Sequence, residues 1–191
     1  MPRRIENDGP SGAPLLVVGR DPGGVEEAEG KPFVGPAGGI LNAAMKRAGL
    51  SRSRALFTNV VKVRPPLDEW ERHDARDVNA GVAELGALLK AEKPQLVVAC
   101  GEQALLACLG FNPLTDSLEE DARLDTITNL RGYRFTGLYG HSVLAMVHPA
   151  DITPYAVVPL GRPARALGRP SRRPLSEISH YDSWGQGDRS P

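Results

Sequence analysis

The sequence has few cysteines, few aromatic side chains and no net charge. Its two cysteines, Cys100 and Cys108, provide neither a disulfide framework nor the four thiolates of a structural metal site. Lysine plus arginine equal aspartate plus glutamate at 23 each, so any nucleic-acid-binding surface must be a local patch. No apolar run is long enough for a signal peptide or a membrane span. We therefore expect a soluble, cytoplasmic protein that does not bind a membrane.

A hydrophobic content of 41% in 191 residues predicts one sizeable core and a single folded domain. Residues 1–13 contain glycine and proline without a periodic apolar pattern, which predicts a flexible N-terminal segment. The folded domain is expected over residues 14–160. Residues 161–191 are rich in proline, arginine and serine, which predicts either a solvated, disordered C-terminal tail or an arm that binds phosphate.

Four short apolar runs, rich in valine and leucine, predict strands that are covered on both faces, as in a parallel sheet. The runs are residues 15–19, 55–61, 95–101 and 143–149. Helical patterns alternate with them at residues 37–50, 77–93 and 102–110. This alternation predicts a three-layer α/β/α sandwich around a central, mainly parallel four-stranded sheet. The stretch RGYRFTGLYGHSV can add a hairpin before the last strand.

Polar side chains follow several of the predicted strands. Asp21 comes just after the first strand, Asn59 lies near the end of the second, and His148 lies near the end of the fourth. Phe33 lies in the long loop that continues from the first strand. Ligands of open α/β sheets bind outside the carboxyl ends of the strands, so we expect these side chains to form one site.

Several motifs follow one another in order along residues 14–152: GRDPGG, a pair of glutamates, GKPFVGPAGGIL, TNVVKVRPP, VVACGEQALLACLG and VHPAD. This succession resembles the uracil-DNA glycosylase superfamily, and within it the family 4 branch most closely. The family 4 versions read GEAPG, GxPFVGxAGxLL and TNVVKCRPP, followed by a histidine-proline-alanine motif. The order and spacing of these motifs are more specific than any single glycine-rich loop.

The resemblance implies a monofunctional DNA glycosylase that flips a pyrimidine out of DNA and hydrolyses its N-glycosidic bond, leaving an abasic site. The sugar becomes positively charged as the base departs, as in glycoside hydrolysis. Asp21 is expected to stabilise this cation and to orient or deprotonate water. His148 is the matching residue for a donor to O2 of the departing base.

The resemblance also implies a base pocket formed by Gly19, Gly23, Phe33 and Asn59. Phe33 is expected to stack on the flipped base, and the amide of Asn59 can pair with either uracil or cytosine. Family 1 enzymes carry a tyrosine at position 23 that rejects 5-methyl groups, whereas glycine leaves that side open. The expected base is therefore uracil or a 5-modified pyrimidine, such as the hydroxymethylated or glucosylated cytosine of phage DNA. The second substrate implies antiviral defence instead of DNA repair.

The first motif departs from family 4 in its acidic residue. Family 4 has an acid at the position of Arg20 and alanine at that of Asp21, whereas family 1, with GQDPY, has aspartate at the latter. We therefore expect Asp21 to be the catalytic acid, with Glu26 and Glu27 as possible supporting groups. His73 is expected to be a helix surface residue, because the histidine-bearing insertion of covalently trapping relatives is absent.

The cysteines of the family 4 iron–sulfur cluster are also missing. Val63 stands at one cluster position, and Gly81 lies near another. Nothing replaces the N-terminal pair of cysteines, and Cys100 and Cys108 are better explained as small buried residues. We predict no metal and no cofactor.

DNA is the expected partner, held by Lys62, Arg64, Gly38 and Ala150 around a monomeric protein. One alternative is a DNA-binding or sensing module that keeps the pocket but has lost catalysis. A nucleotide-binding regulatory domain is a further alternative, but the chain lacks a phosphate loop of the GxxxxGK[ST] type.

Overall fold

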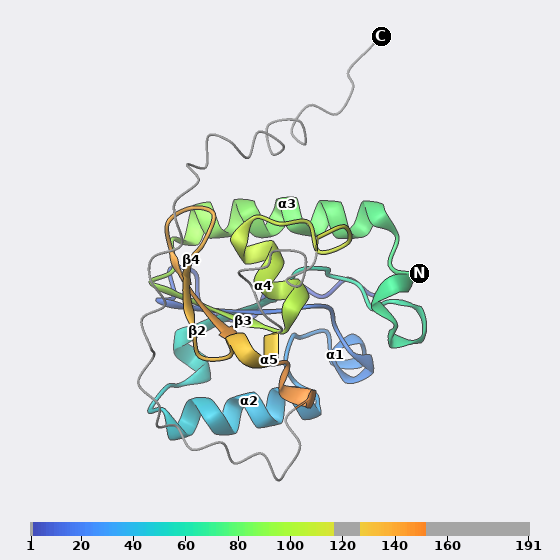
Figure 1. The fold of residues 1–191 in the computed structure, drawn as a ribbon. Coiled ribbons are helices and arrows are strands. Elements are labelled where there is room, and N and C mark those ends of the chain that lie inside the picture. The colour runs from blue at the N-terminus through green and yellow to red at the C-terminus, as the bar shows by residue number, and fades with distance from the viewer. Residues whose placement is uncertain (1, 117–126, 152–191) are drawn as a thin grey trace. The chain divides into compact units, whose positions relative to one another are not determined.

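A five-stranded sheet with the strand order β2-β1-β3-β5-β4 lies at the centre of the fold (Figure 1). The structure is a computed structural model, and it describes residues 2–116 and 127–151. Its elements, in chain order, are β1 (Leu15–Gly19), α1 (Gly24–Glu29), α2 (Pro36–Arg47), η1 (Arg52–Arg54), β2 (Ala55–Asn59), η2 (Pro66–Asp68), η3 (Trp70–Arg72), α3 (Ala75–Glu92), β3 (Leu96–Cys100), α4 (Glu102–Leu109), α5 (Ile127–Leu130), β4 (Arg134–Thr136), β5 (Ser142–Met146) and η4 (Pro149–Asp151).

The sheet confirms the predicted fold class, with one more strand than expected. Strands β1, β2, β3 and β5 pair in parallel, and β4 pairs antiparallel with β5. The fifth strand arises because the expected hairpin before the last strand pairs as β4 and β5. The register of β1 and β2 sets Gly19 opposite Asn59, which brings two of the predicted site residues together.

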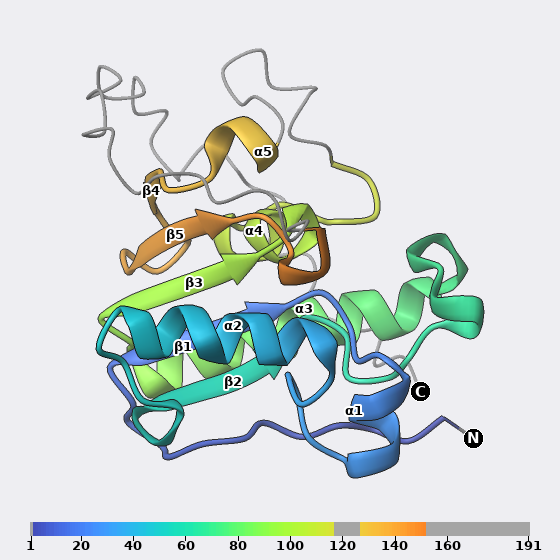
Figure 2. The same cartoon turned by 90° about the horizontal axis from the view of Figure 1, so that it is seen from below.

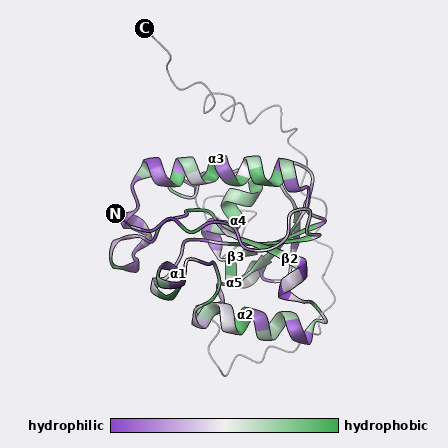
Figure 3. Ribbon diagram, turned by 180° about the vertical axis from the view of Figure 1, so that it is seen from behind, coloured by the Kyte–Doolittle hydropathy of each residue, from purple (hydrophilic) through white to green (hydrophobic). Residues whose placement is uncertain are grey.

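Helices cover both faces of the sheet: α3 and α4 lie on one face and α2 on the other (Figure 1). The apolar residues of β1 alternate between the two faces, as the period of a strand requires. Leu16 belongs to the buried cluster with α3 and α4, whereas Val17 belongs to the cluster with α2. Figure 3 shows the strands largely in the hydrophobic colour and both long helices banded with hydrophilic and hydrophobic residues. The sheet is therefore buried on both faces.

Local signals explain where the two longest helices begin. Helix α2 has Pro36 in its first turn, where its missing N–H costs nothing, and two basic residues in its last turn. Helix α3 begins after Asp74, whose carboxylate accepts a hydrogen bond from the backbone N–H of Arg76 at 2.8 Å.

The N-terminal residues, which were expected to form a flexible segment, pack against the edge of the sheet. Ile5 is fully buried, and Asp8 exchanges backbone hydrogen bonds with Phe57 of β2 at 2.8 and 3.0 Å. The reason is that β2 is an edge strand, whose free backbone groups can bind a further segment. The apolar pattern did not reveal this contact because a single buried isoleucine has no period.

The predicted boundary at residue 160 and the tail at 161–191 lie outside the described residues. The division of the chain therefore stays a prediction. Within the described ranges, no helix is both long enough and apolar enough to cross a membrane.

Candidate active site at the carboxyl ends of the strands

The predicted site residues lie at one edge of the sheet. Figure 2 shows the arrowheads of the parallel strands pointing toward the same end. Asn59 is the last residue of β2, Asp21 follows the end of β1 by two residues, and His148 follows β5 by two residues. The charge of Asp21 acts on the imidazole of His148, as expected for side chains that share this edge.

Gly19 allows two of the base-binding candidates to meet. A Cβ atom at this position would lie 2.3 Å from Oδ1 of Asn59 and 2.8 Å from Cζ of Phe33, so neither contact permits a side chain there. Phe33 and Asn59 are both buried, and the Phe33 ring is tilted against Phe57 with the ring centroids 5.9 Å apart. The structure thus brings the predicted ring and the predicted amide together over a glycine.

Arg52 holds the loop that carries Phe33. Its guanidinium donates hydrogen bonds to the carbonyl oxygens of Pro32 at 2.7 Å and Phe33 at 3.1 Å, and it pairs with Asp8 at 2.8 Å. The same guanidinium lies 4.0 Å from the centroid of the Phe57 ring. Phe33 has a φ of 56°, which is uncommon for a residue other than glycine and needs support from its surroundings.

We expect Arg52→Met to lower kcat/KM about tenfold. Methionine keeps an apolar stem beside Phe57 but loses the hydrogen bonds that hold the loop, so Phe33 would stack less well on the base. Stacking of a base on an aromatic ring contributes about 1–3 kcal/mol. Single-turnover and steady-state kinetics on the substrate DNA measure the effect, with the exposed neighbour Arg54→Met as the matched control. In a Phe33→Ala background the same change should add little. Full activity of Arg52→Met, or an equal loss in both backgrounds, contradicts this role.

Glu26 binds the following part of the same loop. Its Oε1 accepts hydrogen bonds from the backbone N–H groups of Val34 at 3.1 Å and Gly35 at 2.7 Å, and the residue is buried. Its Oε2 would lie 2.9 Å from a Cβ atom at Gly23. The carboxylate of Glu26 therefore lies beside the position that a side chain at residue 23 would occupy.

Asp21 accepts two hydrogen bonds on the same oxygen. Nε of Arg20 and Nε2 of His73 lie 3.0 and 3.1 Å from its Oδ2, and the carboxylate is nearly buried. Neither bond uses Oδ1. The structure therefore holds the predicted catalytic acid in one orientation and, among residues 2–116 and 127–151, leaves its second oxygen for another partner.

His73 is the functional candidate that the sequence reasoning missed. Its side chain is only 1% exposed, and the residue ends the short η3 turn instead of lying on a helix surface. The prediction was wrong because the two short turns after Pro65 bring His73 to the carboxylate of Asp21, just after β1. One sequence signal favours burial: His73 immediately precedes the N-cap Asp74, a position that commonly packs inward.

His148 is half-buried, and one hydrogen bond identifies Nε2 as the ring nitrogen that carries the proton. Its Nδ1 accepts a hydrogen bond from the backbone N–H of Ala150 at 3.3 Å, so Nε2 carries the hydrogen of the neutral ring. Burial lowers the pKa of His148, the Asp151 carboxylate raises it, and the Arg20 guanidinium lowers it, with a net decrease. The imidazole is therefore neutral at pH 7 and can donate from Nε2.

A contact to DNA phosphate requires a side chain at the surface, but Lys62 is buried. Its ammonium group donates to Oδ1 of Asn7 at 2.7 Å and to Oγ1 of Thr58. Burial lowers the pKa of Lys62 to about 8. The N-terminal segment covers this lysine, which is why the motif alone suggested an accessible charge.

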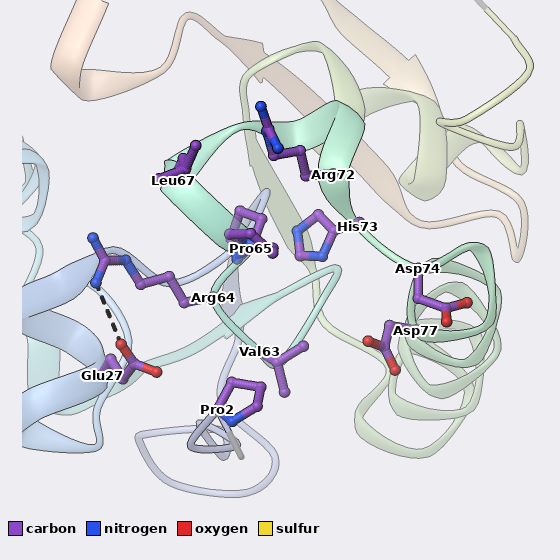
Figure 4. Close-up of a pocket in the computed structure, with 11 residues that line it drawn as sticks. Pro2, Glu27, Val63, Arg64, Pro65, Leu67, Arg72, His73, Asp74 and Asp77 are labelled. Carbon is purple, nitrogen blue, oxygen red and sulfur yellow. Dashed lines mark hydrogen bonds and ion pairs between the residues drawn. The ribbon is translucent and has the colours of Figure 1, made fainter.

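The other predicted DNA contacts differ in exposure. Arg64 forms ion pairs with Asp68 at 2.5 Å and Glu27 at 3.4 Å, the latter drawn in Figure 4. Gly38 is buried, and a Cβ atom there would lie 2.0 Å from the carbonyl oxygen of Phe33, so this glycine serves helix packing. Ala150 is exposed. Of the four predicted contacts, Ala150 alone has neither burial nor an ion pair.

The residues at the cluster positions do not fit an iron–sulfur cluster. Val63 has no ligand atom, and a Cβ atom at Gly81 would lie 2.2 Å from the carbonyl oxygen of Val60. Burial raises the pKa of the Cys108 thiol to about 12 and that of Cys100 further, whereas cluster ligands are thiolates. In the described part of the chain, no group of three histidine, cysteine, aspartate or glutamate side chains could hold a metal ion.

Comparisons with known proteins agree with the geometry. The model of the uracil DNA glycosylase superfamily matches residues 6–172. The chain is 29% identical to the type-4 uracil-DNA glycosylase of Saccharolobus solfataricus over 175 residues, which is 91% of this chain and 71% of the relative. It is 32% identical to the type-4 enzyme of Archaeoglobus fulgidus over 143 residues, 73% of this chain and 67% of the relative. The match to the Thermotoga maritima enzyme is 31% over 140 residues, 71% of this chain and 64% of the relative. The chain therefore belongs to the uracil-DNA glycosylase superfamily, a superfamily of DNA glycosylases, and within it resembles the type-4 enzymes.

Proposed function

We propose that this chain is a monofunctional DNA glycosylase that flips out a pyrimidine nucleotide and hydrolyses its N-glycosidic bond to leave an abasic site. The observation that carries the proposal is the nearly buried carboxylate of Asp21, which is held through one oxygen at the carboxyl end of β1. The superfamily match supports the reaction class. We further propose that the enzyme acts as a monomer in the cytoplasm.

The reaction needs stabilisation of two opposite charges. As the bond between the sugar and the base breaks, its electron pair leaves with the base and the deoxyribose becomes an oxocarbenium-like cation. Asp21 stabilises the cation and accepts a proton from the water whose oxygen bonds to C1′. His148 donates from Nε2 to O2 of the departing base, where negative charge develops.

Phe33 and Asn59 recognise the base in this proposal. The ring stacks on the flipped pyrimidine, and the amide presents a donor and an acceptor to its edge. Both side chains converge on Gly19, which supports this arrangement. Because the amide can pair in either orientation, it accepts both uracil and cytosine edges.

We propose that the base is uracil or a 5-modified pyrimidine. The relatives are named as uracil-DNA glycosylases, which favours uracil. The carboxylate of Glu26 beside Gly23 favours a substituent that carries hydrogen-bond donors, because an ionised carboxylate accepts only. The hydroxyl groups of a hydroxymethyl or glucosyl substituent have this property, and such a base would give the enzyme a role in antiviral defence.

Three DNA duplexes that differ in one base test the proposal: uracil, unmodified cytosine and glucosyl-hydroxymethylcytosine. We expect abasic sites, detected as strand breaks after alkali, in the first or the third and none in the second. Product from uracil alone supports repair, and product from the glucosylated base supports defence. Product from none of the three overturns the proposed function.

The second candidate is a binding module that has lost catalysis. Arg20 at the family 4 acid position and the missing cluster cysteines favour it. Binding of a flipped base without product, in the wild type as well as in an Asp21 variant, would identify such a module.

A further inference from the structure

Beyond the proposed function, on which this inference rests, the structure assigns a second residue to the catalytic acid: we propose that His73 is a positioning residue that orients the carboxylate of Asp21. The two side chains are 52 positions apart in the sequence, and they meet with Nε2 of His73 3.1 Å from Oδ2 of Asp21. Only 1% of the His73 side chain and 9% of the Asp21 side chain are exposed. A contact so well shielded from water restricts both groups.

His73 and Arg20 both bind Oδ2 of Asp21, and this shared acceptor determines how the carboxylate is oriented. Arg20, the residue just before Asp21, donates to the same Oδ2 at 3.0 Å. The terminal torsion of an aspartate is otherwise broad, so one donor would leave the carboxylate free to rotate. Two donors on Oδ2 fix the plane of the carboxylate and direct Oδ1 toward a third group, which in the proposed reaction is the water or the sugar cation.

Trp70 supports both donors. Its ring lies edge-on to the His73 ring with the centroids 5.0 Å apart, and the Arg20 guanidinium lies 5.9 Å from its centroid. Trp70 itself is buried in the core that α3 covers. The loop between β2 and α3 thus provides a rigid backing for a carboxylate on the neighbouring strand.

The loop between β2 and α3 also lines a groove of about 560 Å³, and His73 lies in its wall. Figure 4 shows the His73 ring between Pro65 and Asp74. A histidine needed only for packing there could be replaced by an apolar side chain. The hydrogen bond to Asp21 is the feature that an apolar side chain cannot reproduce.

His73→Leu and His73→Gln test the role, since glutamine can donate from its amide nitrogen at a similar reach. We expect His73→Leu to lower kcat about tenfold to a hundredfold with KM unchanged, because a small misplacement of a reacting group can cost about a hundredfold. His73→Gln should restore most of the loss. His141→Leu, in the turn between β4 and β5, is the control for loss of a half-buried histidine elsewhere.

A double-mutant cycle separates positioning from stability. In an Asp21→Asn background, His73→Leu should lower kcat no further, and thermal unfolding should show all variants folded. Unchanged kcat in His73→Leu, failure of glutamine to rescue a folded protein, or an equal loss in the Asp21→Asn background overturns the positioning role alone, because the wild type and Asp21→Asn still differ. Absence of product from the wild type overturns the proposed function, and this inference with it.

Discussion

Asp21→Asn is expected to lower kcat by about 10³-fold, within the 10²–10⁴-fold contribution typical of a positioned acid or base. The substitution preserves size, and the two donors on Oδ2 decide how the new amide lies. Arg20 and His73 both favour the amide oxygen at their position, so the NH2 group takes the place of Oδ1. A donor then faces the sugar cation where a negative oxygen stood.

Single-turnover cleavage of the substrate DNA measures this effect, with alkali-induced strand breaks as the readout. Asp68→Asn is the matched control, because it makes the same chemical change in an exposed ion pair with Arg64. Binding of the DNA should persist in Asp21→Asn. Product at the wild-type rate would show that the carboxylate is not the reacting group, and binding without product in both proteins would identify the inactive module.

His148→Ala is expected to lower kcat by about 10²–10³-fold, the usual effect of removing one donor to a developing negative charge. The backbone N–H of Ala150 binds Nδ1, so the donor lost is the N–H of Nε2. His148→Gln should retain part of the activity, since its amide nitrogen donates at a similar reach. His141→Ala is the control for the loss of an imidazole, and equal activity of His148→Ala and wild type would exclude this role.

The pH dependence of kcat in the wild type should show the titration of His148. Burial lowers the pKa of His148 below its ordinary value of 6.5. The neutral form therefore predominates at pH 7, and kcat should fall only as the pH drops through a pKa below 6.5. Protonation puts a hydrogen on Nδ1 against the Ala150 N–H and displaces the ring. The acid limb should be absent from His148→Gln.

The geometry also changes how specificity is understood in this chain. A glycine at position 23 suggested an open pocket, and the structure places Oε2 of Glu26 2.9 Å from where a Cβ atom at this position would lie. The same residue anchors the Phe33 loop through Val34 and Gly35. One buried acid thus holds the loop that carries Phe33, and we propose that it also influences base choice.

Local patterns along the chain are enough to predict the layers of the fold and the ends of the strands. Continuous apolar runs predict strands buried on both faces, and residues that end parallel strands must share an edge. This pattern predicts that Asp21, Asn59 and His148 lie at the same edge of the sheet. These predictions succeeded because they depend on period and chain order, which are local properties.

The side chains that surround those residues follow from how distant segments pack against one another. The contact of His73 with Asp21, the cover of the N-terminal residues over Lys62, and the hold of Arg52 on the Phe33 loop all join segments far apart in the chain. No local pattern encodes such contacts, because the side chains that meet across neighbouring elements are chosen by how those elements pack. The reaction class could therefore be inferred from the motifs, whereas the support of the catalytic carboxylate required the fold.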